Sequence, residues 1–173
     1  MVPFHRELPA GYEIHRFGDS DAVSVEDVLD LWRRETVMTE EVAAARVKEV
    51  LLVATGPAGE LAGITTAYLQ RNPQIRLDVW YQRFFVAESH RLGYVGAVLG
   101  WQAIELLEAR YVSGEDQRGV GIAHEFENLG VRAHYTAAVL QPGDFAFIGE
   151  NARGDHVRVR YFPGVLAPPP PWT

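Results

Sequence analysis

The residues best suited to chemistry lie in one stretch near the middle of the chain, from Phe84 to Leu99. A strand-like apolar run ends there, a short segment with Arg91 and two glycines follows, and a helix-like pattern begins. The first turn of a helix leaves main-chain N–H groups unpaired and carries a partial positive charge, so it attracts a phosphate. Arg91 can add a charge-assisted hydrogen bond to the same anion. The alternative is an ordinary strand-to-helix turn, in which the glycines only relieve backbone strain.

Other kinds of site find less support in the residue pattern. The chain has no cysteine, which excludes disulfides, thiolate metal sites and a cysteine nucleophile. Its six histidines are dispersed without an HExxH-type pair, so we expect no metal site. The serines lack a nucleophile-elbow context, and Gly119 and Gly121 lack the rest of a dinucleotide-binding fingerprint. The aromatic run from Trp80 to Phe85 could stack on a ligand but is typical of a core strand.

Hydrophobic periodicity predicts the elements that position this central stretch. Alternation or dense apolar runs predict strands over residues 12–17, 50–55, 61–70, 77–86, 119–126, 145–148 and 156–162. Helical spacing predicts helices after the caps Ser24 and Thr39, from Gly93 to Arg110, and more weakly over residues 128–139. The order contains a strand–helix–strand crossover, which predicts an α+β fold in α/β/α layers around a mixed, largely antiparallel sheet of about seven strands.

The central stretch resembles motif A of the GNAT superfamily of acetyl-CoA-dependent N-acetyltransferases, whose loop reads Arg/Gln-x-x-Gly-x-Gly/Ala. Arg91 matches the first position and Gly96 the last. Tyr94 stands where the family has its middle glycine, and Gly93 lies one residue early. A side chain at Tyr94 could crowd a pyrophosphate, although the main-chain N–H of this residue would still be present.

A second motif strengthens the resemblance. The last helix of the family tends to begin near an asparagine and carries a tyrosine about two turns later, and Asn128 and Tyr135 have that spacing. The order of elements also resembles that of the family over roughly residues 11–162. The resemblance therefore implies an acyl-CoA N-acyltransferase-like fold with acetyl-CoA as cosubstrate and no metal.

The resemblance also implies roles for individual residues. Tyr135 would protonate the leaving thiolate, since its proton is available at neutral pH, unless it is simply a core tyrosine with a bonded hydroxyl. An acceptor amine needs a base, for which Glu125 is the chosen candidate and Asp78 and Glu127 are the other carboxylates near the expected strands. The cofactor-binding set would comprise Arg91, Leu92, Gly93, Tyr94, Val95 and Gly96 for the pyrophosphate, Val86 for the pantetheine, and Asn128.

Three functions stay open at this stage. The leading hypothesis is transfer of an acetyl group to a small-molecule amine or a protein amine. A catalytically inactive GNAT-like binding or regulatory module is the second, because Tyr94 alters the expected CoA loop. The third is a cleft that holds an unrelated small ligand beside the aromatic strand.

Composition bounds these hypotheses. The net charge of −7 disfavours a nucleic-acid partner and favours a cationic one, or simply keeps the protein soluble. The length predicts one domain over residues 1–164 with a proline-rich tail at 165–173. The start of the chain lacks a signal-peptide pattern and no apolar run could cross a membrane, so we expect a cytoplasmic protein. Lys48 is the only lysine, which indicates a GC-rich, bacterial source, and an exposed edge strand leaves a homodimer open.

Overall fold

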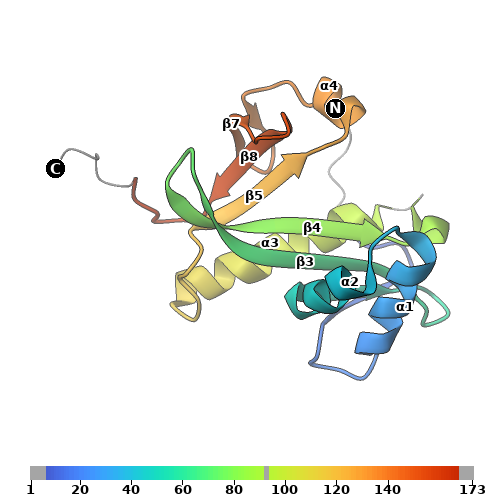
Figure 1. Ribbon diagram of the computed structural model, residues 1–173. Helices are drawn as coiled ribbons and strands as arrows, with labels where there is room; N and C mark the ends of the chain where they lie inside the picture. Colours follow the sequence, from blue (N-terminus) through green and yellow to red (C-terminus); the bar gives the residue numbers. More distant parts are fainter. Residues whose placement is uncertain (1–6, 92–93, 168–173) are drawn as a thin grey trace. The chain divides into compact units, whose positions relative to one another are not determined.

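The computed structural model describes residues 7–91 and 94–167, and within them it contains four α-helices and eight β-strands (Figure 1). In chain order the first half comprises β1 (Glu13–Arg16), α1 (Val25–Glu35), α2 (Glu40–Arg46), β2 (Val50–Thr55), β3 (Leu61–Asn72) and β4 (Leu77–Val86). The second half comprises α3 (Val95–Ser113), β5 (Gly121–Phe126), α4 (Leu129–His134), β6 (Val139–Leu140), β7 (Phe145–Glu150) and β8 (His156–Tyr161). Short 3-10 turns, Val47–Glu49 and Glu88–His90, follow α2 and β4.

The strands form one sheet in the order β1-β2-β3-β4-β5-β8-β7-β6. The pairings of β1 with β2, β2 with β3, β5 with β8, β7 with β8 and β6 with β7 are antiparallel. By contrast β4 and β5 are parallel, because α3 carries the chain back between them. The predicted α+β fold with a mixed, largely antiparallel sheet and a central crossover is therefore confirmed, with eight strands where about seven were expected.

The chain divides into two compact units. Unit 1 comprises residues 1–67 and 83–105, and unit 2 comprises residues 68–82 and 106–173, so that β3, β4 and α3 each contribute to both. The single domain over residues 1–164 stays a prediction, as does the tail at 165–173, whose last six residues lie outside the described part of the chain. No helix among the described residues is both long and apolar enough to span a membrane.

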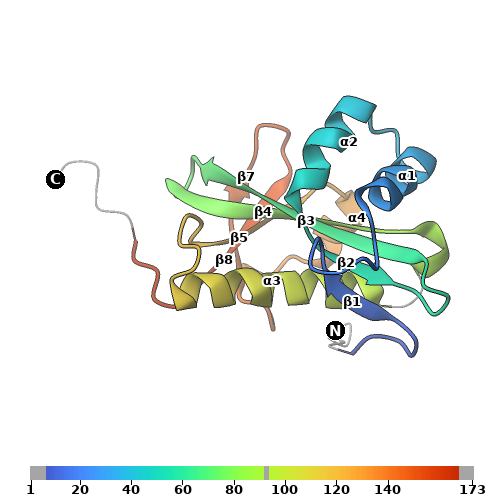
Figure 2. The ribbon, with the colours of Figure 1, turned by 90° about the horizontal axis from the view of Figure 1, so that it is seen from below.

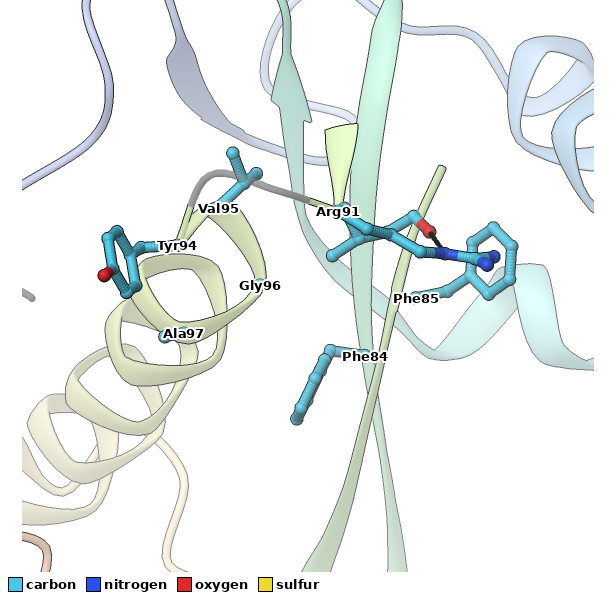
Figure 3. Close-up of a pocket in the computed structure, with 8 residues that line it drawn as sticks. Phe84, Phe85, Arg91, Tyr94, Val95, Gly96 and Ala97 are labelled. Carbon is cyan, nitrogen blue, oxygen red and sulfur yellow. Dashed lines mark hydrogen bonds between the residues drawn. The ribbon is translucent and has the colours of Figure 1, made fainter. Parts of the chain in front are cut away.

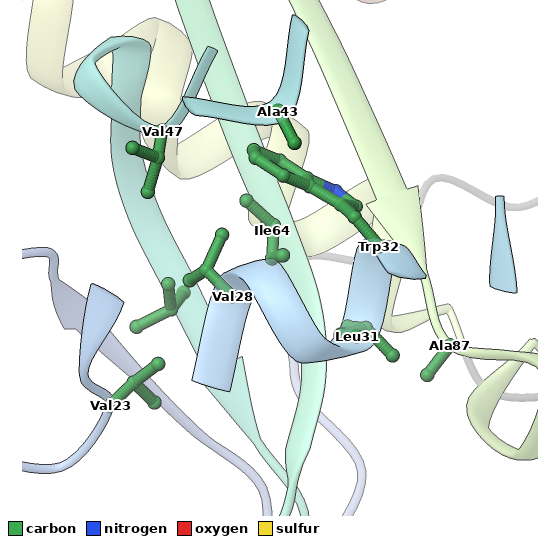
Figure 4. Close-up of a cluster of buried hydrophobic side chains, with 9 residues drawn as sticks. Val23, Val28, Leu31, Trp32, Ala43, Val47, Ile64 and Ala87 are labelled. Carbon is green, nitrogen blue, oxygen red and sulfur yellow. The ribbon is translucent and has the colours of Figure 1, made fainter. Parts of the chain in front are cut away.

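Unit 1 begins with a strongly specified helix. Ser24 caps α1 as predicted: its hydroxyl accepts from Asp27 N–H, while the Asp27 carboxylate accepts from Ser24 N–H at 2.8 Å. The Ser24 hydroxyl also donates to the Asp27 carboxylate at 2.6 Å, and this bond first, then the one from Ser24 N–H, holds the pKa of Asp27 below its ordinary value. The opposite face of α1 packs Val28, Leu31 and Trp32 into the core of unit 1 (Figure 4).

Helices cover both faces of the strands in unit 1. The first two helices lie on one face and α3 lies on the other (Figure 2). On the face of α3, Gly63 of β3 lies so close to the helix that a Cβ there would meet Leu99 Cδ2 at 3.2 Å. The α/β/α layering predicted from the element order is thus present in this unit.

Unit 2 differs from the sequence prediction in one segment. Helix α4 ends at His134, whereas the sequence predicted a helix over residues 128–139, and Val139 and Leu140 form strand β6 instead. Tyr135 O, which a helix to residue 139 would use, accepts from Arg158 Nη2 at 2.8 Å, and Ala138 O accepts from Phe147 N–H at 2.7 Å. A helix after Asn128 is therefore confirmed, but its predicted end at residue 139 was wrong, because tertiary partners override a helix that was weak in sequence.

Candidate functional site

A hollow of about 620 Å³ lies in unit 1 where β4 ends and α3 begins (Figure 3). It is lined by Phe84, Phe85, Val86, Arg91, Tyr94, Val95, Gly96 and Ala97. The lining is mostly apolar, and Arg91 is the one ionised side chain among these residues. Most of the residues that the sequence singled out for a phosphate are thereby brought together, although Leu92 and Gly93 lie outside the described residues.

Gly96 allows the helix to approach the strand this closely. A Cβ on Gly96 would lie 2.8 Å from Val86 Cγ2 and 3.5 Å from the Phe84 ring. Carbon atoms normally meet at about 3.5–4.0 Å, so any side chain here would push α3 away from the end of β4. Packing against Val86 and Phe84 thus requires a glycine here, in addition to the phosphate-binding role that the motif implies.

The start of α3 offers main-chain donors to the hollow. The first hydrogen bond of the helix runs from Val98 N–H to the Tyr94 carbonyl at 3.0 Å. By helix geometry, the N–H groups of Val95, Gly96 and Ala97 precede the regular ladder and carry the positive end of the helix dipole. The Tyr94 ring, 48% exposed, projects away from Gly96 and Phe84 rather than between them (Figure 3).

Arg91 points along β4 and not toward the start of α3. Its Nε donates to the Val86 carbonyl at 3.1 Å, and its guanidinium lies 5.9 Å from the centre of the Phe85 ring. A second partner is Glu35, whose Oε2 lies 3.9 Å from Arg91 Nη2. The side chain is more than half exposed, so it can turn to an anion at the cost of its hydrogen bond to Val86 and its contact with Glu35.

Glu35 also belongs to this region, although it lies outside motif A. Its carboxylate accepts from Glu88 N–H at 2.8 Å and so fixes the 3-10 turn that leads to Arg91. The sequence contained an indication of this role. Glu35 is the last residue of α1, and an acidic side chain is unfavourable at the negative end of a helix. Its position indicates a contact outside its own helix.

The backbone of Val86 faces the edge of β4 away from β3. Ala87 N–H donates to the Ala62 carbonyl of the β3 segment at 2.9 Å. Since successive residues of a strand direct their N–H and C=O groups to opposite edges, the groups of Val86 point the other way. The Val86 carbonyl accepts a hydrogen bond from Arg91 Nε, and the Val86 N–H lies on the same outer edge of β4.

In unit 2, a side-chain bridge continues the pairing of β4 and β5. The main-chain pairs are Trp80 with Ile122 and Tyr81 with Ala123. At the next step His124 Nε2 lies 2.6 Å from Gln82 Oε1; because that oxygen can only accept, the imidazole nitrogen carries the proton. The His124 ring also stacks on Phe145 with centroids 4.5 Å apart. Desolvation lowers the pKa of His124 to about 4, so the ring is neutral at physiological pH.

Tyr135, the proposed acid, lies just beyond the end of α4 instead of within a helix. Its ring is 38% exposed and lies 6.1 Å from the Phe126 ring. Arg158, only 1% exposed, holds the main chain of Tyr135 through the 2.8 Å bond to its carbonyl and also donates to Phe145 O at 3.4 Å. Burial lowers the pKa of Arg158, whose guanidinium also lies 5.7 Å from the centre of the Phe147 ring. Strand alternation gave no signal that this arginine would be buried.

The other predicted site residues also lie in unit 2. Glu125 on β5 accepts from Asn151 Nδ2 at 2.9 Å and from Arg153 Nη2 at 3.3 Å. Asn128 precedes α4, and its Oδ1 accepts from Gly130 N–H at 2.8 Å, as a helix-capping residue does. The structure therefore brings Val86, Arg91 and Tyr94–Gly96 together in unit 1 and places Tyr135, Glu125 and Asn128 in unit 2.

Metal ligation finds no support in the geometry. Over residues 7–91 and 94–167, no group of three or more histidine, aspartate or glutamate side chains is placed to hold a metal ion. Glu125 and Asp155 are joined through the side chains of Asn151 and Arg153.

Comparison with solved structures identifies the fold, whereas neither a family model nor a curated protein sequence matches the chain. A GNAT-family acetyltransferase from Streptococcus pneumoniae is 18% identical over 87% of this chain and 99% of its own, with a TM-score of 0.57. A mutant of the toxin AtaT, bound to the C-terminus of the antitoxin AtaR and to acetyl-CoA, is 13% identical over 88% of this chain and 94% of its own, with a TM-score of 0.55. AtaT complexed with acetyl-methionyl-tRNAfMet is 14% identical over 87% and 94%, with a TM-score of 0.53.

These likenesses cover most of both chains and agree with the parallel β4–α3–β5 crossover described above. The chain therefore has the fold of the GNAT acetyltransferases.

Proposed function

We propose that the protein is an N-acetyltransferase that moves an acetyl group from acetyl-CoA to an amine. The observation that carries the proposal is the hollow at the junction of β4 and α3, which Gly96 keeps open to the main-chain N–H groups of a helix start. Helix starts of this kind bind phosphates, and here the hollow contains no carboxylate to repel one. A GNAT fold in which one structural neighbour was solved with acetyl-CoA supports the same ligand.

The residues around the hollow fit the parts of acetyl-CoA. The diphosphate would take the N–H groups of Val95, Gly96 and Ala97, with Arg91 turning from the Val86 carbonyl to add a charge-assisted hydrogen bond. The free edge of β4 at Val86 would bond the pantetheine arm. The Val86 N–H would also donate to the oxygen that becomes negative as an amine attacks the thioester carbonyl.

Proton transfer would fall to residues of unit 2. An amine with a pKa near ~10 is mostly protonated at neutral pH, so it must lose a proton before attack. We assign this step to Glu125, directly or through water, and protonation of the leaving thiolate to Tyr135. The Arg158 bond to the Tyr135 carbonyl would fix the backbone that carries the phenol. A cytoplasmic, bacterial enzyme acting on a small-molecule or protein amine remains part of this proposal.

Two measurements test the proposal in sequence. Isothermal titration with acetyl-CoA should show one saturable site, and release of free CoA thiol should then depend on an added amine. No detectable binding at millimolar acetyl-CoA would end the proposal. Binding without amine-dependent thiol release across a broad panel of amines would favour the non-catalytic GNAT-like module instead.

A matched pair of variants locates the site. Gly96→Val should abolish the titration signal, because its side chain would collide with Val86 and fill the hollow. Ala44→Val, at an exposed position of α2 in unit 1 outside the lining of the hollow, should bind acetyl-CoA as the wild type does.

A further inference from the structure

A second cavity, of about 400 Å³, lies within unit 2. It is formed by the hairpin end of β3 and β4, by β5, and by the turn between β7 and β8. Unlike the mostly apolar hollow of unit 1, it is lined by many polar side chains, together with two tyrosines. The ones that matter here are Tyr68, Asn72, Tyr81, Glu125, Asn151 and Arg153.

One exposed arginine pairs with three carboxylates, and one of these, Glu125, lines this cavity. Arg153 Nη2 lies 3.3 Å from Glu125 Oε2 and 3.1 Å from Glu127 Oε1, while its Nε donates to Asp155 Oδ2 at 2.8 Å. The Arg153 side chain is 62% exposed, whereas that of Glu125 is only 25% exposed. The contact to Glu125 is the longest of the three, and a solvent-exposed ion pair is weak. Arg153 can therefore release Glu125 while it keeps its bond to Asp155.

The turn that carries Arg153 is held independently of the arginine side chain. Asn151 Oδ1 accepts from the N–H groups of Arg153 and Asp155 at 2.9 and 3.0 Å. Gly154 N–H donates to the Asn151 carbonyl at 2.9 Å. Removal of the guanidinium should leave the turn in place.

The opposite wall of the cavity presents a buried hydroxyl. Tyr81 is 5% exposed, and its oxygen accepts from Asn72 Nδ2 at 2.9 Å. Its own proton finds no acceptor among the residues that the structure describes. Burial raises the pKa of Tyr81, so the hydroxyl stays protonated and able to donate. The ring of Tyr68 stacks on that of Tyr81 at 5.4 Å and adds an apolar surface.

We propose that this cavity binds the amine acceptor, and that Arg153 occupies the position of the acceptor's cationic group until the amine displaces it from Glu125. The ligand class is a small ammonium ion with an oxygen acceptor near the charge: the ammonium pairs with Glu125, and the oxygen accepts from Tyr81 Oη. No bond is made or broken in this step. The role of this amine as acetyl acceptor rests on the proposed acetyl transfer, whereas the binding of an amine in this cavity does not.

Phenylalaninamide is a suitable probe, since it combines an ammonium group, a carbonyl oxygen and an aromatic ring. Its binding is followed by NMR titration without acetyl-CoA. Two analogues each lack one group: 3-phenylpropanamide lacks the ammonium, and phenethylamine lacks the carbonyl. Phenylalaninamide should bind at least roughly tenfold more tightly than 3-phenylpropanamide, because a charge-assisted hydrogen bond is lost in the latter. Equal affinities for these two would overturn the proposal.

Three variants test the residues separately. Glu125→Gln should weaken phenylalaninamide binding roughly tenfold, and Arg153→Gln should strengthen it by about threefold or more, because the competing cation is gone. Tyr81→Phe should weaken binding of phenylalaninamide but not of phenethylamine. Arg118→Gln is the matched control, since Arg118 is an exposed arginine of the same unit that pairs with Asp116 away from the cavity. It changes the net charge equally and should leave all affinities unchanged.

The outcomes are separable from those of the proposed function. Weaker binding in Arg153→Gln, or the same gain in Arg118→Gln, would overturn the role of Arg153, because a general charge effect would then explain the data. Amine binding with this pattern but without acetyl-CoA binding would support the cavity and refute the transferase. Acetyl-CoA binding with no amine-induced shifts in the resonances of the cavity residues would refute the amine site in this cavity and leave the transferase supported.

Discussion

The hollow of unit 1 and the cavity of unit 2 are built in opposite ways. The first is made by the backbone: a glycine lets a helix start approach a strand end, and the polar groups offered are main-chain N–H groups. The second is made by side chains whose charges are already paired with one another. A site of the first kind should be sensitive above all to changes in side-chain volume, and one of the second kind above all to the loss of single charges.

The largest effect is expected in unit 2, from loss of its buried cation. Arg158→Ala should lower the free energy of unfolding by about 3–5 kcal/mol, because the carbonyls of Tyr135 and Phe145 lose their donor and a void remains. Denaturant unfolding measures this. Arg160→Ala, two residues along the same strand, is the control; Arg160 is paired with Glu108 and more accessible, so its loss should cost much less. Similar costs at both positions would show that Arg158 has no special structural role.

The next effect is a pH dependence that belongs to His124. Its pKa is about 4 in the folded protein and near 6.5 when unfolded, so the unfolded state binds more protons between these values. Stability should therefore be full above about pH 6.5 and fall by on the order of 3 kcal/mol as the pH drops toward 4. Unfolding curves at several pH values test this.

The matched variant for that series is His124→Gln, which keeps a donor for Gln82 but does not titrate. Its stability should vary less over the same pH window. If the free energy of unfolding of this variant varied with pH as that of the wild type does, groups other than His124 would be responsible for the pH dependence.

A smaller effect should follow a change of volume in unit 1. Gly96→Ala places a methyl group within 2.8 Å of Val86 Cγ2 and should cost about 1–3 kcal/mol of stability, less the gain in helix propensity. Thermal unfolding gives the shift. Because the double variant Val86→Ala/Gly96→Ala removes the colliding methyl group, it should recover part of the loss; additive losses would show that the contact is not responsible.

The smallest effect tests a purely local feature of unit 1. Ser24→Ala removes the cap of α1 and should cost about 1 kcal/mol, as N-cap replacements usually do. Its effect on acetyl-CoA binding should be nil, because the cap lies outside the lining of the hollow. A loss of binding in this variant would show that the hollow depends on distant helix stability.

Local signals in the sequence were sufficient for most of the fold. The limits of β4 and the cap of α1 were predicted because alternation and capping depend on neighbouring residues. The segment after His134 was mispredicted because its carbonyls bond to Arg158 and β7, which are distant in sequence. Arg158 itself was missed because a charged residue in an alternating strand is expected to face water.

The candidate site shows the same division. Arg91 and Gly96 could be identified from a motif that encodes a backbone shape. The packing of Gly96 against Val86, and the orientation of Arg91 toward Phe85, depend on tertiary contacts that no local pattern encodes. Glu125 was a candidate from the sequence, whereas its grouping with Tyr81 and Arg153 in the polar cavity of unit 2 was not predicted, because these side chains come from separate segments.

Calorimetric titration of the wild-type protein and of Gly96→Val with acetyl-CoA tests the central claim most directly. Saturable binding to the wild type, with none to a folded Gly96→Val protein, is the predicted result. Absence of binding to the wild type at millimolar ligand, or equal binding to both proteins, would contradict a cofactor site at the start of α3.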